Sequence, residues 1–500
     1  MNISQILLNT ANGAPSHRAV VFRNESITYK ELASRVQEKA VGLRKYGIKN
    51  HSHVGLIMGN KPDYVIAYFA LLSLGVTVIP INPLFKENEI TYILNDADAV
   101  AVVVDEIGLG EVLKSRPSLS MVEKVFSLQP EDTVIPWDEV RGVAEDFYLE
   151  PKNKDDHAQI IYTSGTTGKP KGALITHGNL EWMSKTSAEI LELTKEDRVL
   201  VVLPLFHAYA KLQGLLQCVL EGCTIYLEER FIPDAILQKL ADENISVFLG
   251  VPTMYTMFVH SPRISELDFS QLRIAGSGGA SLPVEIIEKV KTLLGVEIGE
   301  GYGQTESTVM ISCYPNDIEK QVGSVGVPLP EIELKLIDPN GREVPIGEVG
   351  EIIFRGPNAM KGYYKKEEET KSTIIDGWVY TGDLARQDEQ GRIYIVDRKK
   401  DMIIRGGFNV YPREVEEVLY THPDIVECAV IGESDPVFGE EVAAYIVTSE
   451  PRTPVEISTF CKQLLAHYKV PKKIYFLSEL PKTATGKILK TPLKKNNLAR

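Results

Sequence analysis

Residues 162–172 read Tyr-Thr-Ser-Gly-Thr-Thr-Gly-Lys-Pro-Lys-Gly, a stretch with three glycines, four serines or threonines and two lysines. The segment 157–162, His-Ala-Gln-Ile-Ile-Tyr, is typical of a buried strand that runs into this loop. Glycines let backbone N–H groups approach an anion, hydroxyl groups add donors, and lysines offset negative charge. The stretch therefore predicts a loop that holds a polyphosphate, although Gly/Ser/Thr clusters are also typical of ordinary surface turns.

The loop differs from the Walker phosphate-binding pattern. That pattern continues from Gly-Lys into Ser or Thr and then a helix. Here Gly168-Lys169 is followed by Pro170, which has no backbone N–H to donate. The sequence therefore favours another nucleotide-binding architecture.

Six further segments follow the loop along the chain. They are Ser277-Gly278-Gly279-Ala280, Gly301-Tyr302-Gly303-Gln304-Thr305-Glu306, Tyr380-Thr381-Gly382-Asp383, Asp397-Arg398-Lys399-Lys400-Asp401, Gly406-Gly407-Phe408-Asn409-Val410 and Pro481-Lys482-Thr483-Ala484-Thr485-Gly486-Lys487. Together with residues 162–172 they resemble, in order, the motifs of the adenylate-forming superfamily, which includes acyl- and aryl-CoA synthetases, adenylation domains and luciferases. The resemblance covers nearly the whole chain and is closest to bacterial medium- and long-chain fatty-acid–CoA ligases.

Composition limits the classes of function. The chain has 500 residues, which predicts two or three domains, and its net charge of −14 argues against a nucleic-acid partner. Residues 469–500 nevertheless carry nine Lys or Arg and one acid, Glu479. This basic segment is either a solvated surface or a binding site for an anionic partner.

The chain is expected to work in the cytoplasm. Its five cysteines have no zinc-binding spacing, which fits a reducing compartment, and its start has no signal-peptide pattern. The 22 uncharged residues 64–85 are interrupted by Gly75, so they predict a buried helix, a turn and a strand rather than a transmembrane segment. Peripheral membrane contact and a homodimer stay open.

The pattern of helices and short Val/Ile-rich strands predicts an α/β fold with mostly parallel sheets. We expect a large N-terminal domain of layered α/β sheets over 1–397, with a β-rich subdomain at about 325–397, and a small α+β C-terminal domain over 401–500. The resemblance implies that 398–400 is a hinge, with Lys400 at the pivot, and that the small domain is mobile. Predicted elements are strands 53–58, 76–81, 99–104, 199–203, 246–249, 331–338, 351–355, 392–396, 426–431 and 441–447, and helices 62–74, 87–95, 412–420 and 455–467.

The resemblance implies ATP, Mg²⁺ and coenzyme A as cofactor and co-substrates, and it assigns residues to each. Asp383 and Arg398 are expected to contact the ribose, Glu306 to hold Mg²⁺, and Thr305 to touch the α-phosphate. Tyr302 is expected to stack on adenine, and Gly278-Gly279-Ala280 to leave room for the base or the acyl group. The predicted nucleotide contacts also include Thr163, Ser164, Gly165, Thr166, Thr167, Gly168, Lys169, Lys171, Gly301 and Gly303.

Lys487 is the residue that the resemblance names as the catalyst of adenylation, bridging the carboxylate and the α-phosphate. Without the resemblance it would be one lysine in a basic segment. Gly406 and Gly407 match the loop that lines the path of the CoA thiol, where glycine lets a thin arm pass close to the backbone. Lys469, Lys472 and Lys473 are expected to meet the CoA phosphates.

The acid is expected to bind beside Pro204-Leu205-Phe206-His207, which resembles an acyl-pocket motif with His207 as a wall or gate. Lys211 follows this motif. It could pair with a distal carboxylate of the substrate or point to solvent, and we expect the solvent orientation.

The leading hypothesis is an AMP-forming ligase that joins a small-molecule carboxylic acid, most simply a medium- or long-chain fatty acid, to CoA. The alternatives are an aryl-CoA ligase of the coumarate type and an adenylating enzyme that loads a carrier protein. A regulatory nucleotide-binding protein is the non-enzymatic alternative. Glu306, Lys487 and the full phosphate loop argue against it.

Overall fold

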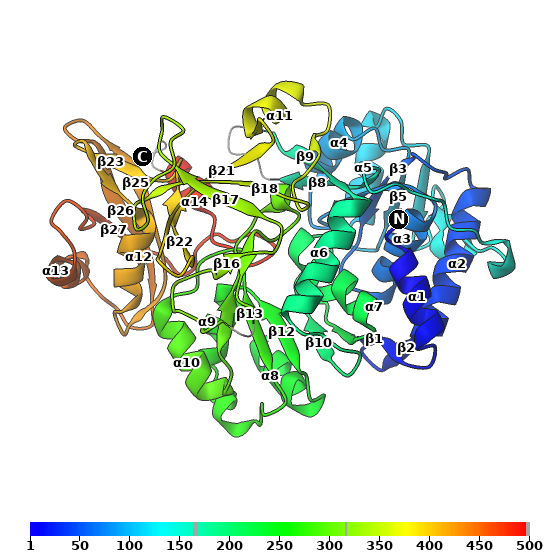
Figure 1. Ribbon diagram of the computed structural model, residues 1–500, viewed down its shortest axis with the longest axis horizontal. Helices are drawn as coiled ribbons and strands as arrows, with labels where there is room; N and C mark the ends of the chain where they lie inside the picture. The colour runs from blue at the N-terminus through cyan, green and yellow to red at the C-terminus, as the bar shows by residue number, and fades with distance from the viewer. Residues whose placement is uncertain (164–168, 316–317, 497–500) are drawn as a thin grey trace.

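The computed structural model describes residues 1–163, 169–315 and 318–496. The predicted contacts Ser164, Gly165, Thr166, Thr167 and Gly168 therefore lie outside the described residues. Two large sheets and their helices form the blue-to-green part of Figure 1, a smaller antiparallel sheet lies beside them, and the orange and red C-terminal part lies at the opposite end from the N-terminus.

An eight-stranded sheet carries the predicted phosphate loop at one edge. The strands run in the order β19-β9-β8-β4-β3-β5-β6-β7, and the sheet is parallel except for β9, which pairs antiparallel with both β8 and β19. Because β8 is followed by the antiparallel strand β9, the loop leads into a strand, whereas a Walker loop leads into a helix. The strands are β3 (His53–Ile57), β4 (Thr77–Ile81), β5 (Ala101–Val104), β6 (Lys124–Ser127), β7 (Ile135–Pro136), β8 (His157–Thr163), β9 (Lys171–Thr176) and β19 (Gly362–Tyr363).

A seven-stranded sheet is the second large layer. Its order is β14-β13-β12-β10-β11-β1-β2, parallel except for the edge strand β2. The segments after β13 and β14 contain the glycine-rich motifs at 278–280 and 301–306, so the parallel arrangement brings these motifs to one edge. The strands are β1 (Arg18–Phe22), β2 (Glu25–Thr28), β10 (Arg198–Val201), β11 (Thr224–Leu227), β12 (Val247–Gly250), β13 (Ile274–Ser277) and β14 (Ile298–Glu300).

The two large sheets share one hydrophobic core. Helix α3 (Pro62–Ser73) has eleven of its twelve residues buried, and its Phe69 belongs to the same cluster as Val54 of β3 and Leu200 of β10. A helix that is apolar all round is expected to be buried in this way. The other helices of this part are α1 (Gln5–Gly13), α2 (Tyr29–Lys45), α4 (Glu87–Asp96), α5 (Leu109–Ser115), α6 (His177–Ile190), α7 (Gln217–Glu221), α8 (Pro233–Asp242), α9 (Pro252–Val259) and α10 (Val284–Leu294).

The uncharged segment 64–85 forms most of α3, a turn at Gly75 and β4, as predicted. Gly75 has φ +72°, a left-handed conformation that glycine adopts easily. Within the described ranges, no helix is both long and apolar enough to cross a membrane.

The β-rich subdomain is a five-stranded antiparallel sheet in the order β17-β18-β21-β20, with β22 also paired to β21. In the register of β21 and β22, Asp383 lies opposite Arg398. The elements are β17 (Glu333–Ile337), β18 (Gly350–Arg355), β20 (Ile374–Ile375), β21 (Trp378–Gln387), β22 (Ile393–Arg398) and helix α11 (Glu367–Thr373), and a small ribbon joins β15 (Ser312–Cys313) to β16 (Val327–Pro328).

The C-terminal part is a separate α+β layer with its own apolar clusters, to which Val415 and Ile446 contribute. Its sheet runs β24-β23-β26-β25, with β27 parallel to β26. The elements are β23 (Ile403–Arg405), β24 (Phe408–Val410), β25 (Ile425–Asp435), β26 (Gly439–Thr448), β27 (Lys473–Phe476), α12 (Pro412–Tyr420), α13 (Pro454–Leu464) and α14 (Lys490–Asn496). The α/β class with a large N-terminal and a small C-terminal part is confirmed.

All five cysteines of the chain are described, and all five are buried and unpaired: Cys218, Cys223, Cys313, Cys428 and Cys461. Burial raises the pKa of the Cys313 thiol to about 12 and that of Cys461 to about 11. The thiols therefore stay protonated at neutral pH.

Candidate active site

Asp383, Arg398 and Tyr302 meet where β21 and β22 face the segment after β14. The Tyr302 hydroxyl donates to Asp383 Oδ2 at 2.7 Å, and Arg398 Nε lies 3.3 Å from Asp383 Oδ1. Asp383 is only 6% exposed. Burial and then the Asp383 charge raise the pKa of Tyr302, so its hydroxyl remains a donor. Three residues predicted separately therefore form one polar cluster.

Glu306 occupies the short 3-10 turn Thr305–Ser307 and is 9% exposed. The Tyr363 hydroxyl donates to Glu306 Oε1 at 2.7 Å. On the other side of Tyr363, the Lys171 ammonium lies 5.2 Å from the ring centroid. Tyr363 therefore connects the predicted metal ligand with a lysine of the phosphate loop.

The described flanks of the phosphate loop are attached to α4. Tyr162 donates to Asp96 Oδ2 at 2.8 Å, and Tyr92 donates to the Pro170 carbonyl at 2.9 Å. The Lys169 ammonium lies 5.2 Å from the Tyr92 ring centroid. Both ends of the loop are thereby fixed to one helix.

Thr163, the last residue of β8, closes the hairpin below the loop. Its hydroxyl donates to the Lys171 carbonyl at 3.5 Å.

Tyr92 and Tyr363 were not predicted to act at the site. The local sequence did not identify either tyrosine, because a tyrosine's hydrogen-bond partner depends on tertiary packing.

Lys487 reaches the site from the C-terminal part. A tight turn holds it: Thr483 N–H donates to the Lys487 carbonyl at 2.8 Å, and Lys487 N–H donates to the Thr483 hydroxyl at 3.0 Å. The Thr253 hydroxyl of α9 donates to the Gly486 carbonyl at 3.2 Å. The turn is thereby joined to the large N-terminal part.

The electrostatic surroundings of Lys487 include two members of the polar cluster. Burial lowers the pKa of Lys487 to about 8; the Arg398 charge acts in the same direction and the Asp383 charge opposes it. An ammonium with this pKa is mostly protonated at neutral pH and able to stabilise negative charge. The charges of Asp383 and Arg398, both of which the resemblance assigns to the ribose, thus act on Lys487.

His207 lies at the mouth of the site, with Tyr209 N–H donating to its Nδ1 at 3.3 Å. His207 is exposed. Loss of hydration lowers the pKa of His207 to about 4, and the charges of Lys211 and Lys487 act in the same direction. The imidazole is therefore neutral at physiological pH.

The predicted glycines differ in their surroundings. A Cβ on Gly303 would lie 2.0 Å from the Val309 carbonyl oxygen, so this glycine is required by backbone packing. A Cβ on Gly278 would touch the Tyr209 ring at 3.4 Å, and Gly279 and Ala280 are exposed. Gly301 makes only ordinary contacts, and its N–H donates to the Ser277 carbonyl at 3.1 Å.

Gly406 and Gly407 form the turn between β23 and β24, with φ +57° and +87°. Gly406 N–H donates to the Phe438 carbonyl at 2.8 Å. The described contacts of this turn lie within the C-terminal sheet, so the structure does not bring these two glycines into the cluster around Lys487.

The basic C-terminal segment is partly neutralised by ion pairs. Lys469 pairs with Glu414, and Lys473 Nζ lies 2.7 Å from Glu433 Oε2, whereas Lys472 is exposed. Of the three lysines predicted to meet CoA phosphates, Lys472 is the one that most clearly faces solvent.

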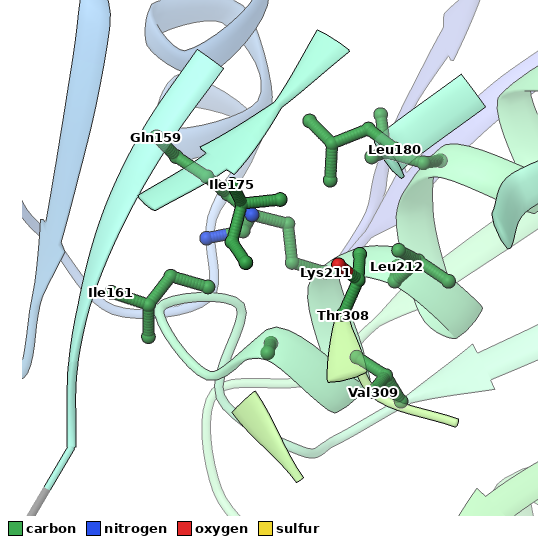
Figure 2. Close-up of a pocket in the computed structure, with 10 residues that line it drawn as sticks. Gln159, Ile161, Ile175, Leu180, Lys211, Leu212, Thr308 and Val309 are labelled. Atoms are coloured by element: carbon green, nitrogen blue, oxygen red, sulfur yellow. The ribbon is translucent and has the colours of Figure 1, made fainter. Parts of the chain in front are cut away.

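The expectation that Lys211 points to solvent is wrong. Lys211 is 1% exposed, and no described residue accepts a hydrogen bond from its ammonium. It belongs to a π-helix (Ala210–Leu216) whose seven residues are all buried, which carries the side chain inward. Figure 2 shows it in a narrow space lined by Gln159, Ile161, Ile175, Leu180, Ala208, Lys211, Leu212, Leu216, Thr308 and Val309.

Comparison with known proteins identifies the family. The profile described as AMP-binding enzyme matches residues 7–364, and the profile of the AMP-binding enzyme C-terminal domain matches residues 414–487. The chain is similar to a feruloyl-CoA synthase from Amycolatopsis sp, with 36% identity over 96% of both chains. It is also similar to a long-chain-fatty-acid–CoA ligase from Bacillus subtilis (strain 168), with 33% identity over 98% of this chain and 94% of the relative.

Two solved structures share the whole fold. The anthranilate CoA ligase AuaEII in complex with anthranoyl-AMP gives a TM-score of 0.95 at 28% identity, over 100% of this chain and 98% of that one. The o-succinylbenzoate CoA synthetase MenE from Bacillus subtilis, in complex with ATP and magnesium, gives a TM-score of 0.86 at 30% identity, over 98% and 99% of the two chains. With the first family profile spanning well over half of its residues, the chain belongs to the AMP-binding enzyme family.

Proposed function

We propose that the protein is an ATP-dependent acid–CoA ligase. In the first step a carboxylate oxygen of the acid bonds to the α-phosphorus of ATP, and the bond to pyrophosphate breaks, leaving an acyl-AMP. In the second step the CoA thiol loses its proton and bonds to the acyl carbon, and AMP leaves with the bonding electrons. The observation that carries the proposal is the approach of Lys487 to the Asp383–Arg398–Tyr302 cluster, joined across the two parts by Thr253 and Gly486.

In this proposal the polar cluster binds the nucleoside. Asp383 can accept from both ribose hydroxyls, because a carboxylate offers two acceptor oxygens, and Arg398 keeps that carboxylate in place. Tyr302 offers its ring to adenine, with its hydroxyl attached to Asp383. Lys169 and Lys171 lie on the described side of the loop that would hold the phosphates.

The residues fit a magnesium ion that arrives with the nucleotide. Among the described residues, no three His, Cys, Asp or Glu side chains cluster into a metal cage, and Glu306 is a single buried carboxylate. Mg²⁺ commonly binds one or two carboxylates together with substrate phosphates and water. Glu306 would hold the ion, which would offset phosphate charge, and the Tyr363 hydrogen bond orients the carboxylate.

Lys487 is proposed as the catalytic residue of adenylation. Negative charge accumulates on the α-phosphate as the carboxylate approaches, and a positioned ammonium stabilises that charge. The low exposure of the lysine strengthens the interaction, since less water screens it. Thr305 beside Glu306 is proposed to contact the α-phosphate, and neutral His207 to line the path of the acid.

We further propose that residues 401–500 rotate about 398–400 for the second step. β22 ends at Arg398 and the next sheet begins with β23 at Ile403, so the connection between the two parts is short. Rotation would bring the Gly406–Gly407 turn toward the acyl-AMP and Lys472 toward the CoA phosphates. Lys472→Glu should then raise the KM for CoA and leave adenylation unchanged, and an unchanged KM would count against this role.

Cytoplasmic location is part of the proposal, supported by five unpaired cysteines. Homodimer formation and peripheral membrane contact are secondary hypotheses. The acid is proposed to be aliphatic, because the lining of the space beside His207 is mostly aliphatic and narrow. The names of the relatives keep an aryl acid as the alternative outcome of the assay.

The test is acid-dependent pyrophosphate release and CoA-dependent AMP formation by the purified full chain. Fatty, aromatic and dicarboxylic acids form the panel, with and without a carrier protein. Lys487→Ala should lower adenylation by about a hundredfold or more. Lys482→Ala, in the same segment but ion-paired to Glu427 on the surface, is the matched control. Equal adenylation by Lys487→Ala and the unmodified chain would refute the assignment.

A further inference from the structure

Lys211 is an isolated cation inside the large N-terminal part. Its side chain is 1% exposed, and its Nζ has no acceptor among the described residues. Burial holds the pKa of Lys211 well below its ordinary value. A buried ammonium without a partner is costly, so such a group normally has an acceptor when its site is complete.

The polar side chains around Lys211 are uncharged. The Tyr68 ring centroid lies 5.3 Å from Nζ, which gives partial compensation through the ring face. Tyr68 donates its hydroxyl to Gln159 Oε1 at 3.2 Å, and the Gln159 amide also carries an NH₂ donor. Thr308 directs its hydroxyl proton to the Asn358 carbonyl at 2.8 Å. None of the ten residues that line this space is acidic.

The space begins beside the proposed reaction centre. Lys211 N–H donates to the His207 carbonyl at 3.1 Å, and the Lys211 charge contributes to the lowered pKa of His207. Thr308 and Val309 follow Glu306 along the chain, and Ile161 lies on the strand that enters the phosphate loop. An acid activated near His207 would therefore extend its far end toward Lys211.

The remaining walls accept a slender chain. Ile175, Leu180 and Leu212 are aliphatic, and Figure 2 shows the Gln159 and Lys211 side chains extending toward each other among them. The side chains are packed too closely in this structure to leave room for a water molecule, so they must move apart to admit such a chain. This combination of aliphatic walls and an inner donor pair suits a methylene chain that ends in an anionic acceptor.

We propose that the preferred substrate is an aliphatic dicarboxylic acid, activated at one carboxylate while the other binds the Lys211 ammonium with support from the Gln159 amide. This inference rests on the ligase function proposed above and names its substrate class. The distal carboxylate supplies the acceptor that Lys211 lacks, and it favours the protonated amine once bound. A monocarboxylic chain of the same length would leave the cation unpaired beside hydrocarbon.

The experiment compares matched acids on the full chain. Adipate is paired with hexanoate and suberate with octanoate, and p-coumarate represents an aromatic acid with a polar tail. We expect kcat/KM for at least one diacid to exceed that of its monoacid by about tenfold or more. Lys211→Met removes the charge and keeps an unbranched side chain that is one atom shorter, and it should reverse that preference.

Lys39→Met is the control for removing a buried lysine. Lys39 is 9% exposed and far from the site, and it donates to the Trp137 carbonyl and lies 4.5 Å from the Trp137 ring. This variant should keep the diacid preference. Thermal unfolding of both variants verifies that they are folded.

Equilibrium binding of suberate and octanoate, measured by calorimetry, separates this inference from the ligase function. Suberate binding that Lys211→Met abolishes, without turnover of any acid, would support the lysine site and refute the ligase function. Turnover that favours monoacids or p-coumarate, with Lys211→Met affecting each acid alike, would overturn the lysine site and leave the ligase function standing. The absence of both binding and turnover for every diacid would also overturn the lysine site.

Discussion

Glu300 gives the structure a pH-dependent stability that one substitution should remove. This residue ends β14, is 5% exposed, and accepts a hydrogen bond from Leu282 N–H at 3.0 Å. Burial raises the pKa of Glu300 to about 7 from its ordinary 4.5, although the Leu282 hydrogen bond and the Arg413 charge oppose the rise and Glu417 adds to it. The folded chain therefore keeps a proton that the unfolded chain releases.

The sign and size of the pH dependence of stability follow from these two pKa values. Stability from this group is fully present below pH 4.5 and is lost as the pH rises through about 7. Each pKa unit is worth about 1.4 kcal/mol, so the loss is about 3 kcal/mol. Glutamine carries no charge at any pH and can still accept from Leu282 through Oε1. Glu300→Gln should therefore gain about 3 kcal/mol over the unmodified chain between about pH 4 and about pH 8.

Urea unfolding followed by tryptophan fluorescence at several pH values measures this difference. Glu297→Gln is the matched control, because Glu297 is exposed and its ion pair with Lys291 lowers its pKa instead of raising it. Its relative stability should change little with pH and in the opposite direction. Parallel pH profiles for Glu300→Gln and the unmodified chain would refute the reasoning.

Three further predictions concern the proposed site. Tyr363→Phe removes the 2.7 Å hydrogen bond that orients the Glu306 carboxylate. The KM for magnesium–ATP should therefore rise on the order of tenfold, while the melting temperature stays nearly constant. An unchanged KM would count against the orienting role of Tyr363. Gly486→Ala places a Cβ 2.8 Å from Thr253 Oγ1 at a residue whose φ is +84°. Adenylation should therefore slow on the order of tenfold, while thioester formation from supplied acyl-AMP should keep its rate. Equal slowing of both steps would contradict a role for the Thr253–Gly486 contact in adenylation alone. Because the Lys487 pKa is lowered to about 8 and the protonated form is the active one, kcat/KM for adenylation should fall above that pH by up to about tenfold per pH unit, and a flat profile to about pH 9 would exclude this titration.

The sequence predicted most of the fold because its local patterns agree with the tertiary structure. The segment 62–74 is apolar on every face, which required burial, and α3 lies inside the shared core. Pro170 departs from the Walker pattern and favoured another nucleotide-binding architecture, and in the structure β8 is followed by the antiparallel strand β9. The strands expected at 331–338, 351–355 and 392–396 appear as β17, β18 and β22.

The candidate site was predicted less completely, because side-chain partners depend on packing between distant segments. The motifs named Asp383, Arg398 and Tyr302 separately, and their meeting follows from the register of β21 and β22 and the position of the segment after β14. Lys211 was misassigned because a lysine among apolar residues usually extends its ammonium to water. The π-helix places the Lys211 side chain in the interior instead, and no local sequence pattern indicated this helix.

The burial of all five cysteines has a practical consequence for labelling the protein. Since all five thiols are buried, with those of Cys313 and Cys461 held protonated, maleimide reagents should leave the native chain largely unlabelled. Two cysteines introduced on exposed positions, one at Val455 and one at Met257, could then carry a fluorophore pair without first deleting native thiols. Energy transfer between such dyes would then test the proposed rotation of the C-terminal part as nucleotide, acid and CoA are added.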